Sequence, residues 1–549
     1  MMARVTREPR GSLECAGIAL GLASLFAVAG AALSLYAGVP EQAIQKTMTW
    51  MSIAWLGTWR LVSRWAYRRR RGPRDGSSRA RWKPPPTDST IVVPVDNGLA
   101  RVGRDGRTMR GECPRLAPAE RAQIFLHRGW EAWMGMAHPT RHLLSARFWR
   151  SISQGTLVVD LALYLHALGW SGADIGMVLS VAGLVGAGLT VLVGLTSDRL
   201  RRKPYLLTYE GLTCICALVA MTQTSPLLLA AAIVLAGFGR GANGAAGPFS
   251  PAEQAWLAES VEPSRRGFVY SLNTAFGFVG MALGAAAAAL PSLWRATLGT
   301  AGSFRPLFGL VLLGNAVNIV LVATTPERHR PGGQRPGHGA MPEGIPDGRA
   351  RENRFLWHLV GLNTFNGMAI GLTGPLISYW FAMRFHIGPG FIGPIMAVTF
   401  FTTALSAIIT APLSQRVGLV RSVVWGRSVG LLLLVLMPIM PLYALAALAY
   451  LLRSALNRGT IGARQALVIS VVHDERRGFA ASMNALSMQV PMSLGPTLAG
   501  AMIGAGWFIT PFYVAAALQG LYVYLYGRVF ASFEQSAMAD GNDRSLEEL

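Results

Sequence analysis

Apolar stretches of about 20 residues recur from Phe148 to about residue 529, separated by short polar loops. A helix of that length crosses a hydrocarbon core of about 30 Å, and only helices or closed barrels satisfy their backbone groups there. The composition agrees, because 14% of the residues are charged, whereas soluble domains carry about 25%. The sequence therefore predicts an all-α polytopic membrane protein.

The apolar stretches form two groups of six, and each stretch is expected to be one membrane-spanning helix. The first group is predicted at residues 148–168, 175–195, 205–221, 227–246, 267–290 and 308–324. The second group is predicted at residues 355–380, 392–413, 423–439, 442–456, 479–503 and 511–529. The segment between the groups, "TPERHRPGGQRPGHGAMPEGIPDGRARENR", is rich in Pro, Gly and charge, which is typical of a flexible linker.

The two groups repeat each other in sequence. "SDRLRRK" at Ser197 matches "SQRVGLVR" at Ser414 with an offset of 217 residues, and "DIGMVLS" and "FIGPIMA" share this offset. "AEQAWLAESVEPSRRGF" at Ala252 matches "ARQALVISVVHDERRGF" at Ala463 with an offset of 211 residues. The chain is thus predicted to be a duplicated six-helix unit, and two halves of the same orientation are one of the repeat arrangements found in secondary transporters.

The duplication divides the chain into six expected parts. An N-terminal hydrophobic region (1–66) is followed by a Pro- and Arg-rich disordered linker (67–145) and the first six-helix half (146–325). A cytoplasmic linker (326–353), the second six-helix half (354–532) and a cytoplasmic tail (533–549) complete the chain. The basic residues of alternate loops and the even number of spans place both termini in the cytoplasm.

The region before residue 146 lies outside the duplication. Its first apolar segment is long enough to span a membrane, and its second ends in a basic cluster around Arg68. A single span would carry that cluster outside, against the cytoplasmic bias of Lys and Arg, so a helical hairpin is expected. Residues 72–133 show no helical or strand period, which indicates disorder. Two alternatives stay open: a cleaved signal peptide, and a translation start at Met134 or Met136 that leaves this region out of the protein.

Sequence motifs of several other classes of function are missing. The chain has no Gly-rich phosphate loop after a strand, no HExxH and no CxxC. Its net charge of +22 would indicate nucleic acid in a soluble protein, but the basic residues lie mainly between apolar stretches, where membrane topology explains them. No enzyme activity, cofactor, metal site or nucleic-acid partner is therefore expected.

The loop between the second and third predicted spans reads "GLTSDRLRRK". It resembles the signature G-x-x-x-D-R-x-G-R-R/K of the major facilitator superfamily, with Arg201 in place of the usual Gly. "RGANGAAG" in the fourth span and "LGPTLAG" in the eleventh also resemble elements of this family. The resemblance covers about residues 148–530 and implies a twelve-helix bundle whose first, fourth, seventh and tenth spans line the transport path. Proton-coupled drug antiporters of the family usually carry a Gly-Pro element in the fifth span, and "GFVGMALGA" lacks the proline.

The matched signature residues are the candidates for a loop that gates the conformational change. They are Gly194, Asp198, Arg199, Arg202 and Lys203. A carboxylate at a helix end among arginines can bridge to a neighbouring helix in one state and release it in another. The alternative is that these basic residues only set the topology.

Ionisable residues inside the spans are the candidates for coupling or substrate contact, because each is costly in hydrocarbon. Asp160 lies about midway along the first span and is expected to be the only acidic side chain well inside the first six spans. Arg240 lies toward the inner part of the fourth span, and a carboxylate with a movable arginine neighbour can carry a proton. The alternatives are a permanent structural ion pair, or an Asp160 that lies in a watery vestibule. Asn273, Asn366 and Asn484 are further candidates, explained equally well as hydrogen bonds between helices.

The predicted function is secondary-active transport of a small organic solute by alternating access, coupled to protons, as a permease or efflux protein. The expected setting is the inner membrane of a bacterial-type cell, with the solute, protons and the lipid bilayer as partners and a monomeric state. The alternative is a membrane receptor or assembly scaffold that has the same fold and transports nothing.

Overall fold

The computed structural model describes ten ranges of the chain, which are 91–95, 98–102, 108–109, 133–196, 202–240, 247, 249–262, 265–327, 346–472 and 477–547. The chain divides into two compact units, Met1–Gly135 and Met136–Leu549. The N-terminal hydrophobic segments predicted within 1–66, most of the linker predicted at 326–353, and Asp198 and Arg199 lie outside the described residues.

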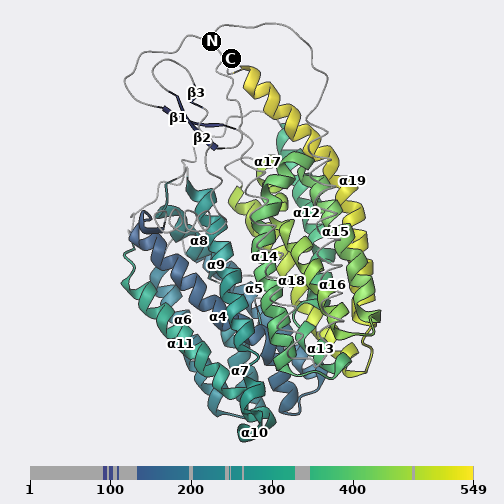
Figure 1. The fold of residues 1–549 in the computed structure, drawn as a ribbon. Helices are drawn as coiled ribbons and strands as arrows, with labels where there is room; N and C mark the ends of the chain where they lie inside the picture. The colour runs from purple at the N-terminus through teal and green to yellow at the C-terminus, as the bar shows by residue number, and fades with distance from the viewer. Residues whose placement is uncertain are drawn as a thin grey trace. The chain divides into compact units, whose positions relative to one another are not determined.

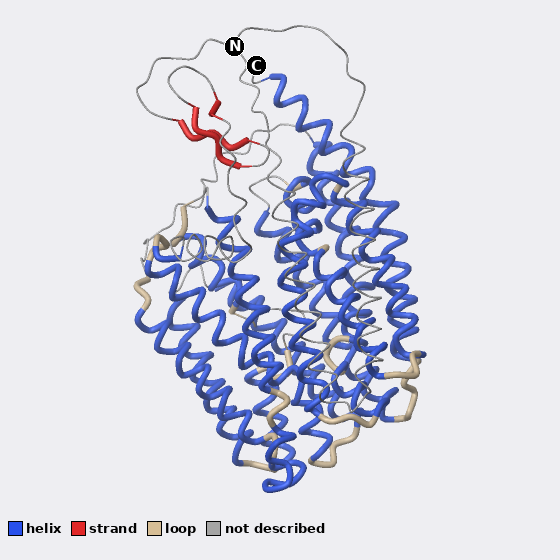
Figure 2. The backbone as a smooth tube through the Cα atoms, viewed as in Figure 1, coloured by secondary structure: helices blue, strands red, loops and turns tan. Residues whose placement is uncertain are grey.

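Apart from residues 133–135, the described part of the first unit is a small antiparallel sheet. Its strands β1 (Ile91–Val95), β2 (Gly98–Val102) and β3 (Thr108–Met109) pair in the order β1-β2-β3 (Figure 2). This corrects the expectation that residues 72–133 have no strand period. "IVVPV" is rich in β-branched residues, and the two residues between β1 and β2 have the length of a hairpin connection.

The described residues of the second unit are helical, and Figure 1 shows the two halves side by side. The first half contains α4 (His138–Ala167), α5 (Gly172–Thr196), α6 (Arg202–Thr222), α7 (Pro226–Ala236), α8 (Ser250–Glu259), α9 (Arg266–Ala287), α10 (Pro291–Gly302) and α11 (Arg305–Thr324). The second half contains α12 (Pro346–Thr373), α13 (Ile377–Phe385), α14 (Pro389–Val417), α15 (Leu419–Leu436), the short 3₁₀-helix η2 (Met437–Ile439), α16 (Tyr443–Gly459), α17 (Ile461–Val471), α18 (Arg477–Gly504) and α19 (Thr510–Glu547).

Several of these elements differ from the predicted spans. Helix α4 begins at His138, within the linker predicted at 67–145 and before the predicted first span 148–168. The fourth span is shorter than predicted, because α7 ends where Gly237 takes a left-handed φ of 67°. The seventh span is divided into α12 and α13 around Pro375, which cannot donate a backbone hydrogen bond. Helices α8, α10 and α17 match no predicted span, and each is too short to cross a membrane.

Six of the described helices are long and apolar enough to cross a membrane by length and composition. They are Gly172–Val193, Arg202–Thr222, Val269–Ala287, Arg305–Thr324, Pro389–Ser406 and Leu419–Ile439. Among the other long helices, α4 carries buried polar residues, including Arg147, Arg150 and Asp160. Hydropathy therefore detects the helices with apolar surfaces more readily than those whose polar groups face the protein interior.

Glycines let helix backbones touch at equivalent places in the two halves. A Cβ added to Gly155 on α4 would lie 2.3 Å from the carbonyl oxygen of Met281 on α9. A Cβ added to Gly371 on α12 would lie 2.2 Å from the carbonyl oxygen of Met492 on α18. Small residues are common where membrane helices approach closely, and the paired contacts show that the sequence duplication is also a duplication of packing.

Helices α5 and α18 join the two halves through a similar glycine contact. A Cβ at Gly176 would lie 2.2 Å from the carbonyl oxygen of Pro496, and one at Gly500 would lie 2.1 Å from that of Gly172. Since carbonyl groups of a helix cannot yield as a flexible side chain does, a larger residue at these positions must push the halves apart.

Gly176→Ala is therefore expected to destabilise the protein by about 1–3 kcal/mol, the usual cost of overpacking. Gly188→Ala on the same helix is the matched control, because nothing lies within 4 Å of its added Cβ. Thermal unfolding of the two purified variants checks this. Equal unfolding temperatures would show that the α5–α18 contact yields without cost.

Candidate functional site

A cavity lies between the two halves and encloses about 1120 Å³, its open mouth included. Helices α4 to α7 and α11 line it from the first half, and α18 lines it from the second. Its polar lining includes Gln154, Glu210, Arg240, Gln489 and Ser493. Both halves thus contribute polar groups to one space at the interface of the two repeats, which is where transporters of this construction bind their solutes.

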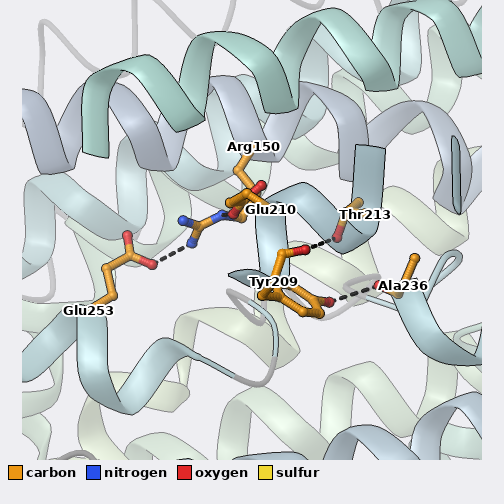
Figure 3. Close-up of polar contacts among 6 residues, drawn as sticks. All are labelled: Arg150, Tyr209, Glu210, Thr213, Ala236 and Glu253. Carbon is orange, nitrogen blue, oxygen red and sulfur yellow. Dashed lines mark hydrogen bonds and ion pairs between the residues drawn. The ribbon is translucent and has the colours of Figure 1, made fainter. Parts of the chain in front are cut away.

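A network of three buried charged side chains joins α4, α6 and α8 (Figure 3). Arg150 Nε lies 2.7 Å from Glu210 Oε1, and Arg150 Nη1 lies 2.5 Å from Glu253 Oε2. The three residues are 6%, 1% and 3% exposed, in that order. Because a guanidinium presents five donors in a fixed plane, this one arginine holds carboxylates from two other helices at once.

A second arginine balances the charge of this network. Arg147 lies one helical turn before Arg150, is 4% exposed, and acts electrostatically on Glu253. Two arginines and two glutamates leave the group without net charge. Because a buried charge is costly unless it is paired, the network fixes how α6 and α8 pack against α4. Arg150 and Glu210 also line the cavity, so the ion pair that joins α4 to α6 forms part of the cavity wall.

Asp160 is not among the side chains that line the cavity. It is 1% exposed and lines a second, small cavity, whose other side chains are Leu157, Leu161, Tyr164, Phe304, Leu307 and Phe308. Within the described residues, neither of its carboxylate oxygens has a hydrogen-bond partner. The prediction that Asp160 is the only acidic side chain well inside the first six spans is wrong, because Glu210 lies within α6. The sequence already contained this second acidic residue, because Glu210 lies inside the predicted span 205–221.

Arg240 lines the cavity at the turn that follows α7. Its Nε donates a hydrogen bond to the carbonyl oxygen of Gly237 at 3.2 Å, and Tyr209 lies beside it. The Tyr209 hydroxyl donates to the carbonyl oxygen of Ala236 at 2.7 Å (Figure 3). Among the described residues no ion pair joins Arg240 to Asp160, so this conformation does not bring the two predicted coupling residues together.

The three predicted asparagines lie in different surroundings. Asn366 is fully buried, and its Oδ1 accepts a hydrogen bond from Arg427 Nη1 at 2.5 Å. Asn484 Oδ1 accepts one from Asn363 Nδ2 at 2.9 Å, which joins α18 to α12. Asn273 on α9 is 9% exposed and lies outside the cavity lining. Two of the three therefore join neighbouring helices of the second half.

The described part of the predicted gating loop is tied to the end of the first half. Arg202 Nη1 lies 2.8 Å from Glu259 Oε2, and the Arg202 backbone N–H donates to Glu327 Oε1 at 2.8 Å. Lys203 Nζ donates to the carbonyl oxygen of Ala323 at 2.5 Å. Gly194 lies near the end of α5. The start of α6 is thus fastened to α8 and to the end of α11.

The family model of the Major Facilitator Superfamily matches the chain twice, at residues 143–365 and 359–536. The chain belongs to this superfamily. Each match covers most of one half of the helical unit, and together they confirm the predicted fold of two six-helix halves. The protein is an integral membrane protein of a family of secondary transporters, and the family is not one of enzymes.

Solved transporter structures share this fold at low sequence identity. The nucleoside transporter NupG is 14% identical, with a TM-score of 0.55 over 72% of this chain and 99% of that one. A bacterial homolog to the human lysosomal transporter Spinster, in an inward-facing and unoccupied conformation, is 14% identical, with a TM-score of 0.54 over 73% and 96%. A D-xylose–proton symporter is 12% identical, with a TM-score of 0.56 over 70% and 96%. No curated protein matches the sequence. At these identities the likeness shows the fold alone.

Proposed function

We propose that this protein moves a small organic solute across the membrane by alternating access, coupled to protons. The observation that carries the proposal is the cavity between the halves, which takes polar side chains from α4, α6 and α18. A site shared between two halves changes its exposure when one half rocks against the other. The alternating-access motion then needs no change inside either half.

The contact between α5 and α18 supports a state closed on one side. It involves Gly172 and Gly176 at the beginning of α5 and Gly500 near the end of α18. With both termini cytoplasmic, the beginning of α5 faces the outside. The cavity would then communicate with the cytoplasm in this conformation, and opening to the outside would require α5 and α18 to separate.

Proton coupling is assigned to Asp160, because coupling needs a carboxyl group that can bind and release a proton as its surroundings change. Asp160 is buried among mainly apolar side chains. An ionised carboxylate is costly in such surroundings, so its charge state depends on which groups the conformational change brings near it. Arg240, at the cavity, is the cation proposed to approach it in another state.

The proposed setting is a monomer in the inner membrane of a bacterial-type cell. We expect both termini and the linker near Gly332 to be cytoplasmic, because the basic residues favour alternate loops. Fusions of a reporter that is active only in the cytoplasm, placed at Gly332 and at each terminus, should all be active. An inactive fusion at Gly332 would invert the topology.

Uptake by proteoliposomes tests the function. The purified full chain is reconstituted and challenged with a panel of solutes, with and without an imposed proton gradient. We expect at least one solute to accumulate faster with the gradient than without it, and protein-free liposomes give the background. Absence of transport for every class of solute by folded protein would favour the receptor or scaffold alternative.

Asp198→Asn is expected to slow turnover several-fold while leaving solute binding unchanged. The residue lies in the sequence between the end of α5 and the fastened start of α6, so it is proposed to act on conformational exchange. Turnover is measured in proteoliposomes and affinity on the purified protein. Equal loss of both would place Asp198 in the solute site instead.

A further inference from the structure

The charged network of the first half has a counterpart in the second half with a different charge. Arg427 on α15 occupies the position of Glu210 on α6, at the offset of 217 residues between the repeats. Arg464 in "ARQALVISV" occupies the position of Glu253 in "AEQAWLAES". Both glutamates of the first-half network are thus arginines in the second half.

The side chains that hold these two arginines lie on α12, the counterpart of α4. Arg427 Nη1 donates to Asn366 Oδ1 at 2.5 Å, and Arg464 Nη2 donates to Asn363 Oδ1 at 2.8 Å. The two asparagines lie one helical turn apart, as the two arginines of α4 do. The contacts are therefore made at matching places, but neutral amides have replaced the arginines and cations have replaced the carboxylates.

These two arginines lie close together, and a third lies near them. The guanidinium carbons of Arg427 and Arg464 are 5.3 and 5.8 Å from the centroid of the same ring, Tyr522, and their charges act on each other. Arg453 Nη2 donates to Thr373 Oγ1 at 3.3 Å, and the charge of Arg427 acts on it. We call Arg427, Arg453 and Arg464 the arginine cluster.

The arginine cluster is buried, and it has no counter-ion among the residues that the structure describes. Its members are 3%, 7% and 9% exposed in chain order, and no described carboxylate forms an ion pair with them. The Nε atoms of Arg453 and Arg464 have no hydrogen-bond partner within the described residues. Residues 354–532 contain only two carboxylates, Asp474 and Glu475, and both lie outside the described part of the chain. Buried cations that no carboxylate neutralises are costly, so the arginine cluster, as the structure describes it, offers a place for negative charge.

We infer that the arginine cluster binds the anionic group of the transported solute, a carboxylate or a phosphate, which makes the solute an organic anion. The inference rests on the proposed transport function and names the class of its substrate. Guanidinium groups bind these anions through short, charge-assisted hydrogen bonds with matching planar geometry. In the first half, Glu210 and Glu253 occupy the equivalent sites and neutralise the arginines there.

The cluster lies close to the cavity along α18. Arg464 Nη1 contacts the sulfur of Met488 at 3.9 Å, and the next residue, Gln489, lines the cavity. A methionine side chain has three rotatable bonds and adapts readily to a new neighbour. The inference requires Met488 to rotate so that a solute in the cavity can reach the cluster.

Thermal unfolding of the detergent-purified full chain tests the site without requiring transport. The probes are sodium succinate, inorganic phosphate, sodium chloride and choline chloride at equal ionic strength. A ligand that binds only the folded state raises the unfolding temperature in a saturable way. We expect succinate or phosphate to do so, more strongly than either chloride salt, with at least a ten-fold loss of apparent affinity in Arg427→Gln and Arg464→Gln.

Two further variants control the experiment. Arg528→Gln removes an exposed arginine of the same half and should respond like the parent chain. Asn366→Arg combined with Arg427→Glu rebuilds the ion pair of the first half, and it should remain folded and lose the response to anions. The inference is overturned if no anion exceeds the chloride salts, if Arg427→Gln and Arg464→Gln respond like the parent, or if chloride alone saturates the site.

Transport assays separate this inference from the proposed function. If anions stabilise the parent but not the cluster variants, and proteoliposomes transport nothing, the site stands and the transport function fails. If Arg464→Gln transports its solute at the parental rate, or the solute found is neutral or cationic, the transport function stands and the inference fails.

Discussion

Arg150→Ala is expected to abolish transport and to reduce the free energy of unfolding by about 3–5 kcal/mol, the usual effect of removing one partner of a buried ion pair. The substitution leaves Glu210 and Glu253 buried without the cation that lies 2.7 and 2.5 Å from them. It also separates three helices that the guanidinium joins. Thermal and denaturant unfolding of purified protein measure the loss, with the exposed Arg295→Ala as control.

A charge-free version of the network separates stability from function. Arg150→Met combined with Arg147→Met, Glu210→Gln and Glu253→Gln removes all four charges, and neutral replacement of a buried ion network often restores stability. We expect this quadruple variant to fold nearly as stably as the parent and yet to transport nothing. Parental stability of Arg150→Ala would show that water or a rearrangement compensates the two carboxylates.

Asp160→Asn is expected to abolish gradient-driven accumulation of solute while leaving the protein folded. Asparagine preserves the volume of the side chain in the small cavity beside Tyr164 and Phe308, but it cannot bind and release a proton. Exchange of solute between the two sides, which needs no net proton movement, should persist. Transport rate against pH is measured for the variant and the parent.

The matched control for this experiment is Asp174→Asn. Asp174 is exposed at the beginning of α5, where its Oδ2 accepts a hydrogen bond from Ser171 at 2.6 Å, so its loss should change neither the rate nor the pH profile. If Asp160→Asn transports at the parental rate with an unchanged pH profile, the residue is structural. The assignment of proton coupling to Asp160 would then fail.

The arrangement of helices was predictable from the sequence, because it depends on features that are local or repeated. Apolar length located the spans, and the repeated "RRGF" phrases revealed the two halves. The small sheet at residues 91–109 was missed because Pro and Arg dominate the composition around its few β-branched residues. The end of α7 depends on the backbone conformation of Gly237, which a hydropathy pattern does not register.

The charged networks were not predictable in the same way. Arg150 and Glu253 are far apart in sequence and belong to different helices, and nothing in either segment shows that their side chains meet. Spacing along one helix shows which residues share a face, but not which helix that face contacts. The aligned repeats already show that Arg427 stands where the first half has Glu210. The structure adds that both side chains are buried and make contacts at equivalent places in the two halves.

The glycine contacts between α5 and α18 affect how large a difference in binding free energy a solute needs to shift the protein between its two conformations. Backbone atoms meet there over several turns, at Gly176, Gly500 and their neighbours, and each such contact is individually weak. Separating the helices therefore removes many small attractions in succession, together with the hydrogen bond that Thr497 Oγ1 donates to Ser180 Oγ at 2.7 Å. A difference in solute affinity between the two states of a few kcal/mol would suffice to reverse their populations. A solute that binds weakly can thus still switch the protein from one conformation to the other.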